Sequence, residues 1–401
     1  MNKTTLRSTQ GHTFKVTGQL NTLGGQCSGL DLAVREGGSG TRYVVKWLIK
    51  GHQDEIARNE ILLKMTALQA IPQVLAPRDI VRDGNRVGIV TPYLECGMTI
   101  EELLQNPRSV REHMVIALQL AHLVALLEGL GIHHGDLSSQ NAMLVLVAGV
   151  PRVFLIDLDN ASGAGLPPAM MMGGEFYAAA ERENTSNQPD ASSEAYSLAV
   201  MLHELLLGTH PFQNDLGLTI EQARRTPWLY DPNLAARQPY GLPPELLHPA
   251  LVDTFRATLQ PDPALRTPAA RWREILRTLV ADCRLAFCAA CQMPFHIHSG
   301  RSECPSCRLR FQRAIVTAAS QRLEVPQSLM LGRDHCGNPS VSREHVWITR
   351  RGPELIAEVR SATSPTWLCA NGQWRELRAG EVVPLPHGAS LRLHDSEFIV
   401  E

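Results

Sequence analysis

The chain has 401 residues, 44% of them apolar, which is long enough for two or three domains with buried cores. Lys and Arg number 38 against 40 Asp and Glu, so the formal net charge is −2 at pH 7. Because a nearly neutral chain offers no extended positive field to a polyanion, the composition argues against nucleic-acid binding.

The first 13 residues, MNKTTLRSTQGHT, are polar and are expected to form a flexible N-terminus. They lack the apolar core of a signal peptide, so the sequence predicts a cytoplasmic protein. The longest apolar stretch, 114–130, contains Gln119, His122 and Glu128, whereas a spanning helix needs about 20 residues with few such interruptions. It is predicted to be a buried core helix, with no role at a membrane.

Residues 14–95 are rich in predicted strands. The runs TFKVTGQL, LDLAVRE and TRYVVKWLI favour β-structure and are separated by glycine-containing turns. One helix is predicted over residues 54–71, ended by Pro72. Its expected apolar face consists of Ile56, Ile61, Met65 and Leu68.

Residues 96–283 read mostly as helix, interrupted by two polar motifs. HHGDLSSQNAML places Asn141 five positions after Asp136, and the apolar run VFLID ends at Asp157. Transfer of a γ-phosphoryl group needs a carboxylate that accepts the hydroxyl proton and hard oxygen ligands for Mg²⁺. These residues resemble the catalytic loop and the metal-binding Asp of the eukaryotic-like (Hanks-type) bacterial Ser/Thr protein kinases.

The resemblance implies ATP and Mg²⁺ (or Mn²⁺) as cofactors. Asp136 would be the catalytic base, while Asn141 and Asp157 would hold the metal. Lys46, which interrupts an apolar strand, and Glu60 in the following helix would form the ion pair that positions the α and β phosphates.

Two further parts of the nucleotide site follow from the same resemblance. The phosphate loop would be LGGQCSGLDL, in which Gly24, Gly25 and Gly29 depart from the usual glycine order. The hinge beside the adenine would be Pro92, Tyr93 and Leu94.

Three later features separate protein kinases from small-molecule kinases with a similar catalytic loop. Glu181 in GGEFYAAAE stands where the family closes its activation segment, and Arg266 stands where the family keeps the Arg that pairs with it. Between them, residues 194–212 resemble the long buried helix of the C-terminal lobe, with Glu194 in place of an Asp. The resemblance covers residues 14–283.

The departures from the family leave two alternatives open. The D-F-G motif is DLD at residues 157–159, and the Lys two residues after Asp136 is Ser138. A pseudokinase scaffold is one alternative, and a small-molecule phosphotransferase is the other. The Arg that clamps an activation-loop phosphate in many kinases is Gly135, so we expect a kinase that activation-loop phosphorylation does not switch on.

Four cysteines after the kinase-like region have metal-ligand spacing. Cys288, Cys291, Cys304 and Cys307 form two C-x-x-C pairs separated by twelve residues. This spacing allows two turns to close a tetrahedral S₄ site and resembles a zinc ribbon. The sequence therefore predicts bound zinc, with His296 and His298 between the pairs as surface residues.

The last region resembles the forkhead-associated (FHA) fold, a β-sandwich that reads phosphothreonine. The resemblance rests on Gly332 and Arg333, followed by the S-R-x-H motif at 342–345. Arg333 and Ser342 would contact the phosphate from two loops. SATSPT at 361–366 lacks the Asn with which the family grips the peptide backbone, and a sandwich used only for packing is the alternative.

Together these assignments predict a multidomain α+β protein. A bilobal protein-kinase fold would have its N-lobe at 14–95 and its C-lobe at 96–283, followed by a zinc ribbon at 284–315 and an FHA-like β-sandwich at 320–401. The expected partners are a protein substrate and a phosphothreonine peptide, for which the N-terminal Thr4, Thr5, Ser8 and Thr9 are candidates. By analogy with bacterial kinases of similar composition, a von Willebrand A protein and a metal-dependent phosphatase are further candidates.

Overall fold

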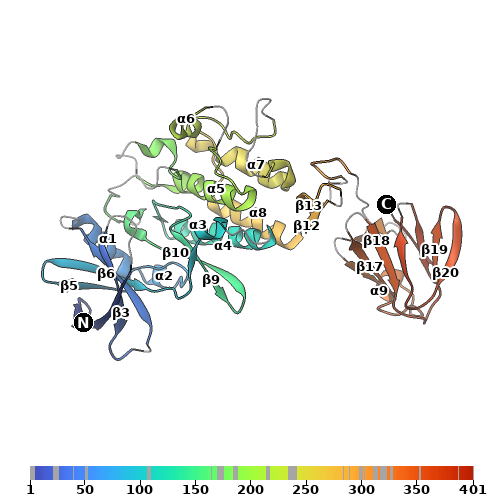
Figure 1. Ribbon diagram of the computed structural model, residues 1–401, viewed down its shortest axis with the longest axis horizontal. Coiled ribbons are helices and arrows are strands. Elements are labelled where there is room, and N and C mark those ends of the chain that lie inside the picture. Colours follow the sequence, from blue (N-terminus) through green and yellow to red (C-terminus); the bar gives the residue numbers. More distant parts are fainter. Residues whose placement is uncertain are drawn as a thin grey trace. The chain divides into compact units, whose positions relative to one another are not determined.

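The computed structural model describes residues 5–20, 27–38, 40–49, 53–105, 110–163, 165–168, 176–183, 188–213, 217–233, 242–282, 284–288, 290–297, 301, 303–309, 315–316, 323–325, 328–351, 354–386 and 388–400. The chain forms two compact units, Met1–Pro244 with Pro249–Val280 and Glu245–His248 with Ala281–Glu401. Each unit has its own core, so each is described by itself (Figure 1).

The first lobe of the first unit is a closed antiparallel barrel in the order β1-β2-β3-β4-β6-β5. Its strands are β1 (Thr5–Ser8), β2 (Thr13–Leu20), β3 (Cys27–Arg35), β4 (Arg42–Leu48), β5 (Asp79–Asp83) and β6 (Arg86–Pro92). Inward-facing side chains, among them Phe14, Val45 and Trp47, fill the barrel. The alternation of buried and exposed positions that places them there is the period-two pattern of strands.

The prediction of a flexible N-terminus is wrong for the residues described there. Strand β1 pairs with β2 and, through Arg7 with Arg82 and Ser8 with Val81, with β5, which closes the barrel. Leu6 is only 2% exposed inside it. A four-residue strand with one apolar residue carries too little periodicity to be recognised from sequence. Thr4 lies outside the described residues.

The helix predicted over residues 54–71 is divided in two. Helix α1 (Gln53–Lys64) and helix α2 (Thr66–Gln69) are separated at Met65, whose backbone is extended. The buried side chains of α1 are mostly polar, namely Glu55, Arg58, Asn59 and Leu62. Of the predicted apolar face, Leu68 is buried and Ile56, Ile61 and Met65 are half-buried, so the prediction holds only in part. The fully buried positions of α1 are mostly polar, and this matters for the site.

The second lobe of this unit is mainly helical, as predicted. Its helices are α3 (Ile100–Gln105), α4 (Val110–Gly129), α5 (Ala191–Leu207), α6 (Ile220–Arg224), α7 (Pro249–Thr258) and α8 (Ala269–Asp282), with 3₁₀ turns η1 (Leu158–Asn160), η2 (Ala180–Glu183) and η4 (Pro263–Leu265). A further 3₁₀ turn, η3 (Pro244–Leu246), has Glu245 and Leu246 in the second unit. The strands of the helical lobe are β7 (Met98–Thr99), β9 (Ala142–Val147) and β10 (Val150–Leu155) in one sheet, and β8 (Ile132–His133) with β11 (Ser162–Gly163) in another.

Helices α4 and α5 form the centre of this lobe and pack against each other (Figure 1). Residues 112–129 of α4 are long and apolar enough to span a membrane by composition alone, but half of that window is buried within the protein. Helix α5 begins at a capping box on Asp190 and ends at Gly208, which takes the left-handed conformation that glycine favours. It therefore stops before the predicted end at residue 212.

The second unit begins with a hairpin of β12 (Arg284–Phe287) and β13 (Pro294–Ile297), followed by β14 (Ile315–Val316) paired with β15 (Leu323–Glu324). Two four-stranded sheets follow, in the orders β16-β17-β18-β21 and β20-β19-β22-β23. Their elements are β16 (Ser328–Leu331), α9 (Arg333–Cys336), β17 (Val346–Arg351), β18 (Glu354–Val359), β19 (Thr366–Ala370), β20 (Gln373–Leu377), β21 (Val382–Leu385), β22 (Ser390–Leu393) and β23 (Ser396–Ile399). Residues of both sheets share one apolar core, as in a β-sandwich.

Candidate functional site

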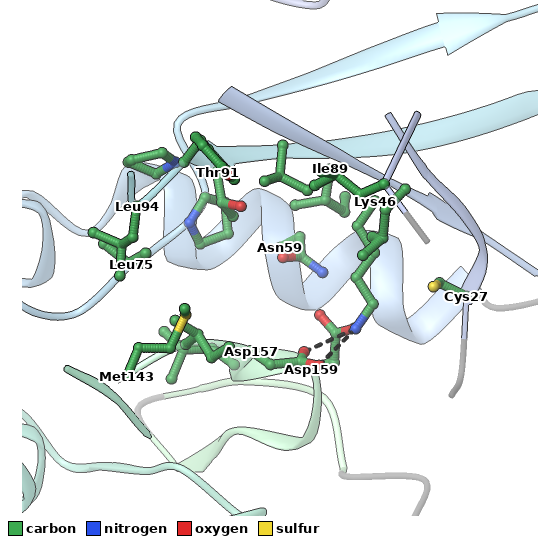
Figure 2. Close-up of a pocket in the computed structure, with 18 of the residues that line it drawn as sticks. Cys27, Lys46, Asn59, Leu75, Ile89, Thr91, Leu94, Met143, Asp157 and Asp159 are labelled. Carbon is green, nitrogen blue, oxygen red and sulfur yellow. Dashed lines mark hydrogen bonds and ion pairs between the residues drawn. The ribbon is translucent and has the colours of Figure 1, made fainter. Parts of the chain in front are cut away.

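A cavity of about 530 Å³ lies in the first unit, lined by strands of the barrel and by residues of the helical lobe. Leu75, Leu94 and Met143 are at its apolar end, and Lys46, Asp157 and Asp159 lie at the other (Figure 2). The predicted hinge residues Pro92, Tyr93 and Leu94 all line it. An apolar cavity with a cation and carboxylates at one end fits a flat base with attached phosphates.

Lys46 and Asp157, both assigned to the nucleotide site from the sequence, lie in direct contact, which the sequence did not predict. The Lys46 Nζ is 2.9 Å from Oδ1 and 2.8 Å from Oδ2 of Asp157, and it also contacts the carboxylate of Asp159 (Figure 2). Burial alone would lower the pKa of Lys46, but the two carboxylates raise it above its ordinary value. Lys46 is therefore a fixed positive charge at the polar end of the cavity.

The backbone of Asp157 is in the left-handed region, with φ 63° and ψ 75°. For a residue other than glycine this conformation costs about 1–3 kcal/mol. The strained turn directs the carboxylate of Asp157 to Lys46, and η1 follows immediately. Backbone strain is common at functional sites, where a side chain must be held in one direction. The strained backbone therefore supports a functional role for Asp157.

The prediction that Glu60 pairs with Lys46 is wrong. Glu60 is exposed on α1, while Glu55 of the same helix is buried and Asn59 lines the cavity. Five residues along an α-helix correspond to a rotation of about 140°, so Glu55 and Glu60 cannot face the same neighbour. Sequence reasoning missed Glu55 and Asn59, because a polar residue outside the apolar face of a predicted helix carries no signal that it faces inward.

Asp136 and Asn141 lie together in the catalytic loop. The Asn141 Nδ2 donates to the backbone oxygen and to Oδ2 of Asp136, each at 2.9 Å. This contact orients the Asp136 carboxylate and leaves the Asn141 side-chain oxygen as the atom suited to a hard cation.

Glu194 of α5 holds the start of this loop. Its carboxylate accepts from the backbone N–H groups of His134 at 3.0 Å and Gly135 at 2.8 Å, and it is 3% exposed. Burial raises the pKa of Glu194 above its ordinary value. The residue that stands in place of the family's Asp therefore anchors the catalytic loop to the central helix.

The predicted ion pair of Glu181 and Arg266 is present. The Arg266 Nη2 lies 2.9 Å from Oε2 of Glu181, and Nη1 contacts the other oxygen, so the pair is bidentate. The Arg266 side chain is 1% exposed and its guanidinium lies over the Tyr196 ring at 4.7 Å. The pair joins the end of the activation segment to the region before α8.

The predicted phosphate loop is described only in part. Gly24 and Gly25 lie outside the described residues, whereas Gly29 belongs to β3 beside a bulge between Cys27 and Gly29. Cys27 lines the cavity near Lys46 (Figure 2).

In the second unit, the four predicted zinc ligands converge. The ligand atoms of Cys288, Cys291, Cys304 and Cys307 all lie within 4.8 Å of one another, with Sγ separations of 3.4 Å for Cys288 and Cys307 and 3.6 Å for Cys291 and Cys304. Sulfurs placed about 2.3 Å from a zinc ion at tetrahedral corners are about 3.8 Å apart. The four thiols therefore fit a tetrahedral ion of this size.

The two cysteine turns have the same backbone geometry. The N–H of Gln292 donates to the Cys288 carbonyl at 2.9 Å, and that of Arg308 donates to the Cys304 carbonyl at 2.9 Å. Gln292 and Arg308 both have positive φ, 59° and 61°. Burial would raise the pKa of the Cys288 thiol, but neighbouring backbone N–H groups lower it to about 6, which favours the thiolate that binds metal.

His296, predicted to be a surface residue, is instead 3% exposed. Its Nδ1 accepts from the backbone N–H of His248 at 3.1 Å, within the same unit. Arg301 also holds this segment, through the carbonyl of Glu245 at 2.7 Å and that of Leu247 at 3.1 Å. The two cysteine turns are thus packed on residues that precede α7 in the chain. His298 lies outside the described residues.

We expect purified protein to contain one zinc ion per chain, and Cys304→Ser to lose it, because three thiolates leave the shell incomplete. Metal content per chain, measured after gel filtration, checks this. Cys369→Ser is the matched control, since Cys369 lies in β19, outside the cluster. The expectation would be contradicted if wild-type protein, purified without a chelator, contained no metal and all four thiols reacted with a thiol reagent.

Arg333 and Ser342 are neighbours at one end of the sandwich. The backbone N–H of Arg333 donates to the Ser342 carbonyl at 3.0 Å, and its Nε donates to the Val341 carbonyl at 3.1 Å. A Cβ on Gly332 would lie 1.9 Å from the Arg343 carbonyl oxygen, so this close approach of the two loops requires glycine. His345 is fully buried and bonded to Thr366 at 2.9 Å, consistent with a role in holding the loops.

The fold and the cleft of the first unit define a protein of the protein-kinase class. A family model described as "Protein kinase domain" matches residues 20–276. "Ribosomal protein S6 kinase 2 alpha" of Xenopus laevis is 26% identical over 189 residues, which are 46% of this chain and 25% of that protein. "Ribosomal protein S6 kinase alpha-3" of Homo sapiens is 27% identical over 176 residues, 43% of this chain and 23% of that protein.

The chain therefore belongs to the protein kinase family. Its aligned region spans about a quarter of the length of these relatives. The family model supports the predicted protein-kinase domain, and the match ends at residue 276. The zinc and phosphothreonine assignments for the later residues depend on their own contacts.

Proposed function

We propose that the chain is an ATP- and Mg²⁺-dependent protein serine/threonine kinase, active in the cytoplasm, whose C-terminal part binds zinc and reads phosphothreonine. The observation that carries the catalytic part is the pair of Lys46 with Asp157 at the polar end of an otherwise apolar cavity. Asp136, oriented by Asn141, supplies the carboxylate for the acceptor hydroxyl.

Each residue of the site has a defined task in this proposal. The apolar end of the cavity would hold the adenine, and Lys46 would neutralise phosphate oxygens. Asp157 and Asn141 would hold Mg²⁺, which supplies charge neutralisation on the phosphates when bound. Asp136 would orient the hydroxyl of a protein substrate and accept its proton.

We expect the purified chain to transfer label from γ-labelled ATP to Ser or Thr, on itself or on an added protein, and Asp136→Ala to reduce the rate by about 10²- to 10⁴-fold because the proton acceptor is lost. Phosphate mapped by mass spectrometry checks this. An equal rate in the variant would contradict the assignment of Asp136. No transfer by the wild type to itself, to added partner proteins or to small alcohols, despite nucleotide binding, would favour a pseudokinase scaffold.

The phosphothreonine module would act through Arg333 and Ser342. Among the described residues, the Arg333 guanidinium is bonded only through Nε, so its outer nitrogens remain for a phosphate. A phosphorylated partner is the natural ligand in this proposal, and a von Willebrand A protein or a metal-dependent phosphatase remains a candidate by analogy alone.

A peptide copied from a mapped phosphothreonine site should bind the full chain, and Arg333→Ala should weaken binding by about tenfold or more, because a charge-assisted hydrogen bond is worth about 1.5–3 kcal/mol. Isothermal titration with the phosphorylated and unphosphorylated peptides measures the difference. Arg351→Ala is the matched control. It also removes one positive charge, but Arg351 lies at the end of β17 that is far from the Arg333 loops. Equal affinity for both peptides would contradict phosphate reading.

A further inference from the structure

A second aspartate stands in the kinase cleft where the family has glycine. Asp159, the last residue of the DLD motif, lies in η1, and its side chain is 9% exposed. Its carboxylate also contacts the Lys46 Nζ, next to the carboxylate of Asp157 (Figure 2). Lys46 is thus held by two carboxylates from one short segment, and neither belongs to helix α1.

Helix α1 reaches this lysine through Asp159. The Glu55 carboxyl group is hydrogen-bonded to the Asp159 carboxyl group. Glu55 lies on the buried face of α1 and is 3% exposed, so the helix holds this carboxyl group beside Asp159. Asp159 in turn contacts the Lys46 Nζ, so its side chain lies between helix α1 and the lysine.

Arg58 of the same helix fixes the backbone of this segment. It is 1% exposed and donates to the carbonyl oxygens of Asp159 at 2.7 Å and Ala161 at 2.9 Å. Its Nη2 also reaches the carbonyls of Pro167 at 3.1 Å and Pro168 at 2.6 Å. Asp159 is therefore held by α1 at both its side chain and its main chain.

We propose that Asp159 is the positioning residue for Lys46, and that it couples helix α1 to the lysine in place of a direct glutamate contact. The inference rests on the proposed kinase function, in which Lys46 acts on the phosphates. Glu60 is exposed, so it does not contact Lys46. Asn59 lines the cavity, but its side-chain amide donates to the Glu55 carbonyl at 2.9 Å. The usual glycine at this position would leave Lys46 with Asp157 alone.

The first test reads the lysine itself and does not need catalysis. Asp159→Asn keeps the shape of the side chain but removes the charge. Loss of one of the two carboxylates that contact Nζ should raise the rate of Lys46 acetylation by acetic anhydride about tenfold, because the amine is then held by one charged partner instead of two. Site-resolved mass spectrometry of the full chain measures the rate. Glu60→Gln should leave it unchanged.

The second test is kinetic. Asp159→Asn and Asp159→Gly should lower kcat by about 10- to 100-fold through misplacement of Lys46, with less than about a threefold change in the KM for ATP, because the apolar cavity is intact. Asp159→Glu should recover part of the rate. Melting curves for each variant separate this loss from unfolding.

The two tests separate failure of the inference from failure of the proposed function. If Asp159→Asn leaves both Lys46 acetylation and kcat unchanged, or if Glu60→Gln changes them instead, the positioning role is overturned. If the wild type has no kinase activity but Lys46 acetylation responds to Asp159→Asn alone, the contact role is supported and the proposed function fails.

Discussion

Gly135→Ala is expected to lower the stability of the kinase unit by at least about 3 kcal/mol. Gly135 has φ +78°, and a Cβ there would lie 2.1 Å from the backbone oxygen of Asn160. The left-handed backbone alone costs about 1–2 kcal/mol for a residue with a side chain, and the clash is with main chain that cannot rotate away. For a unit of this size we expect the melting temperature to fall by about 6–12 °C.

Gly149→Ala is the matched control for this prediction. Gly149 has the same φ, +78°, but nothing lies within 4 Å of the position its Cβ would take. It should therefore show only the backbone cost of about 1–2 kcal/mol. Urea unfolding of both variants measures the difference, and equal losses would show that the close approach to Asn160 is unimportant.

The contact between Gly135 and Asn160 also bears on regulation. It joins the loop that carries Asp136 to the segment that carries Asp157. Ser162 donates to the Pro189 carbonyl at 2.7 Å and is 3% exposed, and the Tyr177 hydroxyl is bonded to Ser139 and Glu204. Both hydroxyls of the described activation segment are thus engaged, which agrees with the hypothesis that no phosphate there activates the enzyme.

Motifs with fixed chemistry were the predictable part of this molecule. Lys46 lies on a strand and Glu181 pairs with Arg266, as the resemblance implies, because the motifs that contain them are defined by residue type and order along the chain. The four cysteines converge for a similar reason, since a metal shell constrains their spacing.

The buried face of helix α1 could not be predicted in this way, because it is largely polar and hydrophobic periodicity does not mark it. Glu55, Arg58 and Asp159 stabilise one another in a buried network, so no single one of them interrupts an apolar pattern. The aspartate in place of the D-F-G glycine was the one signal in the sequence that pointed to this network.

Arg266→Ala is expected to destabilise the kinase unit by about 3–5 kcal/mol, because it leaves Glu181 without its bidentate partner in a largely buried site. Arg266 also donates from Nε to the Gln260 carbonyl at 3.1 Å, so the loop before η4 loses a bond as well. We expect the melting temperature to fall by about 6–20 °C. We also expect the rate of phosphoryl transfer to fall, in proportion to the fraction of molecules in which the activation segment is ordered.

Arg271→Ala provides the control, since Arg271 pairs with Glu274 on the surface of α8 with side chains 57% and 55% exposed. An exposed pair is worth about 0–1 kcal/mol, so this variant should melt near the wild type. Arg266→Lys distinguishes charge from shape: a lysine restores the charge but not the two parallel hydrogen bonds, and it should recover less than half of the loss. Full recovery by lysine would mean that the positive charge alone holds the activation segment, and similar melting temperatures for Arg266→Ala and Arg271→Ala would mean that the pair does not hold it.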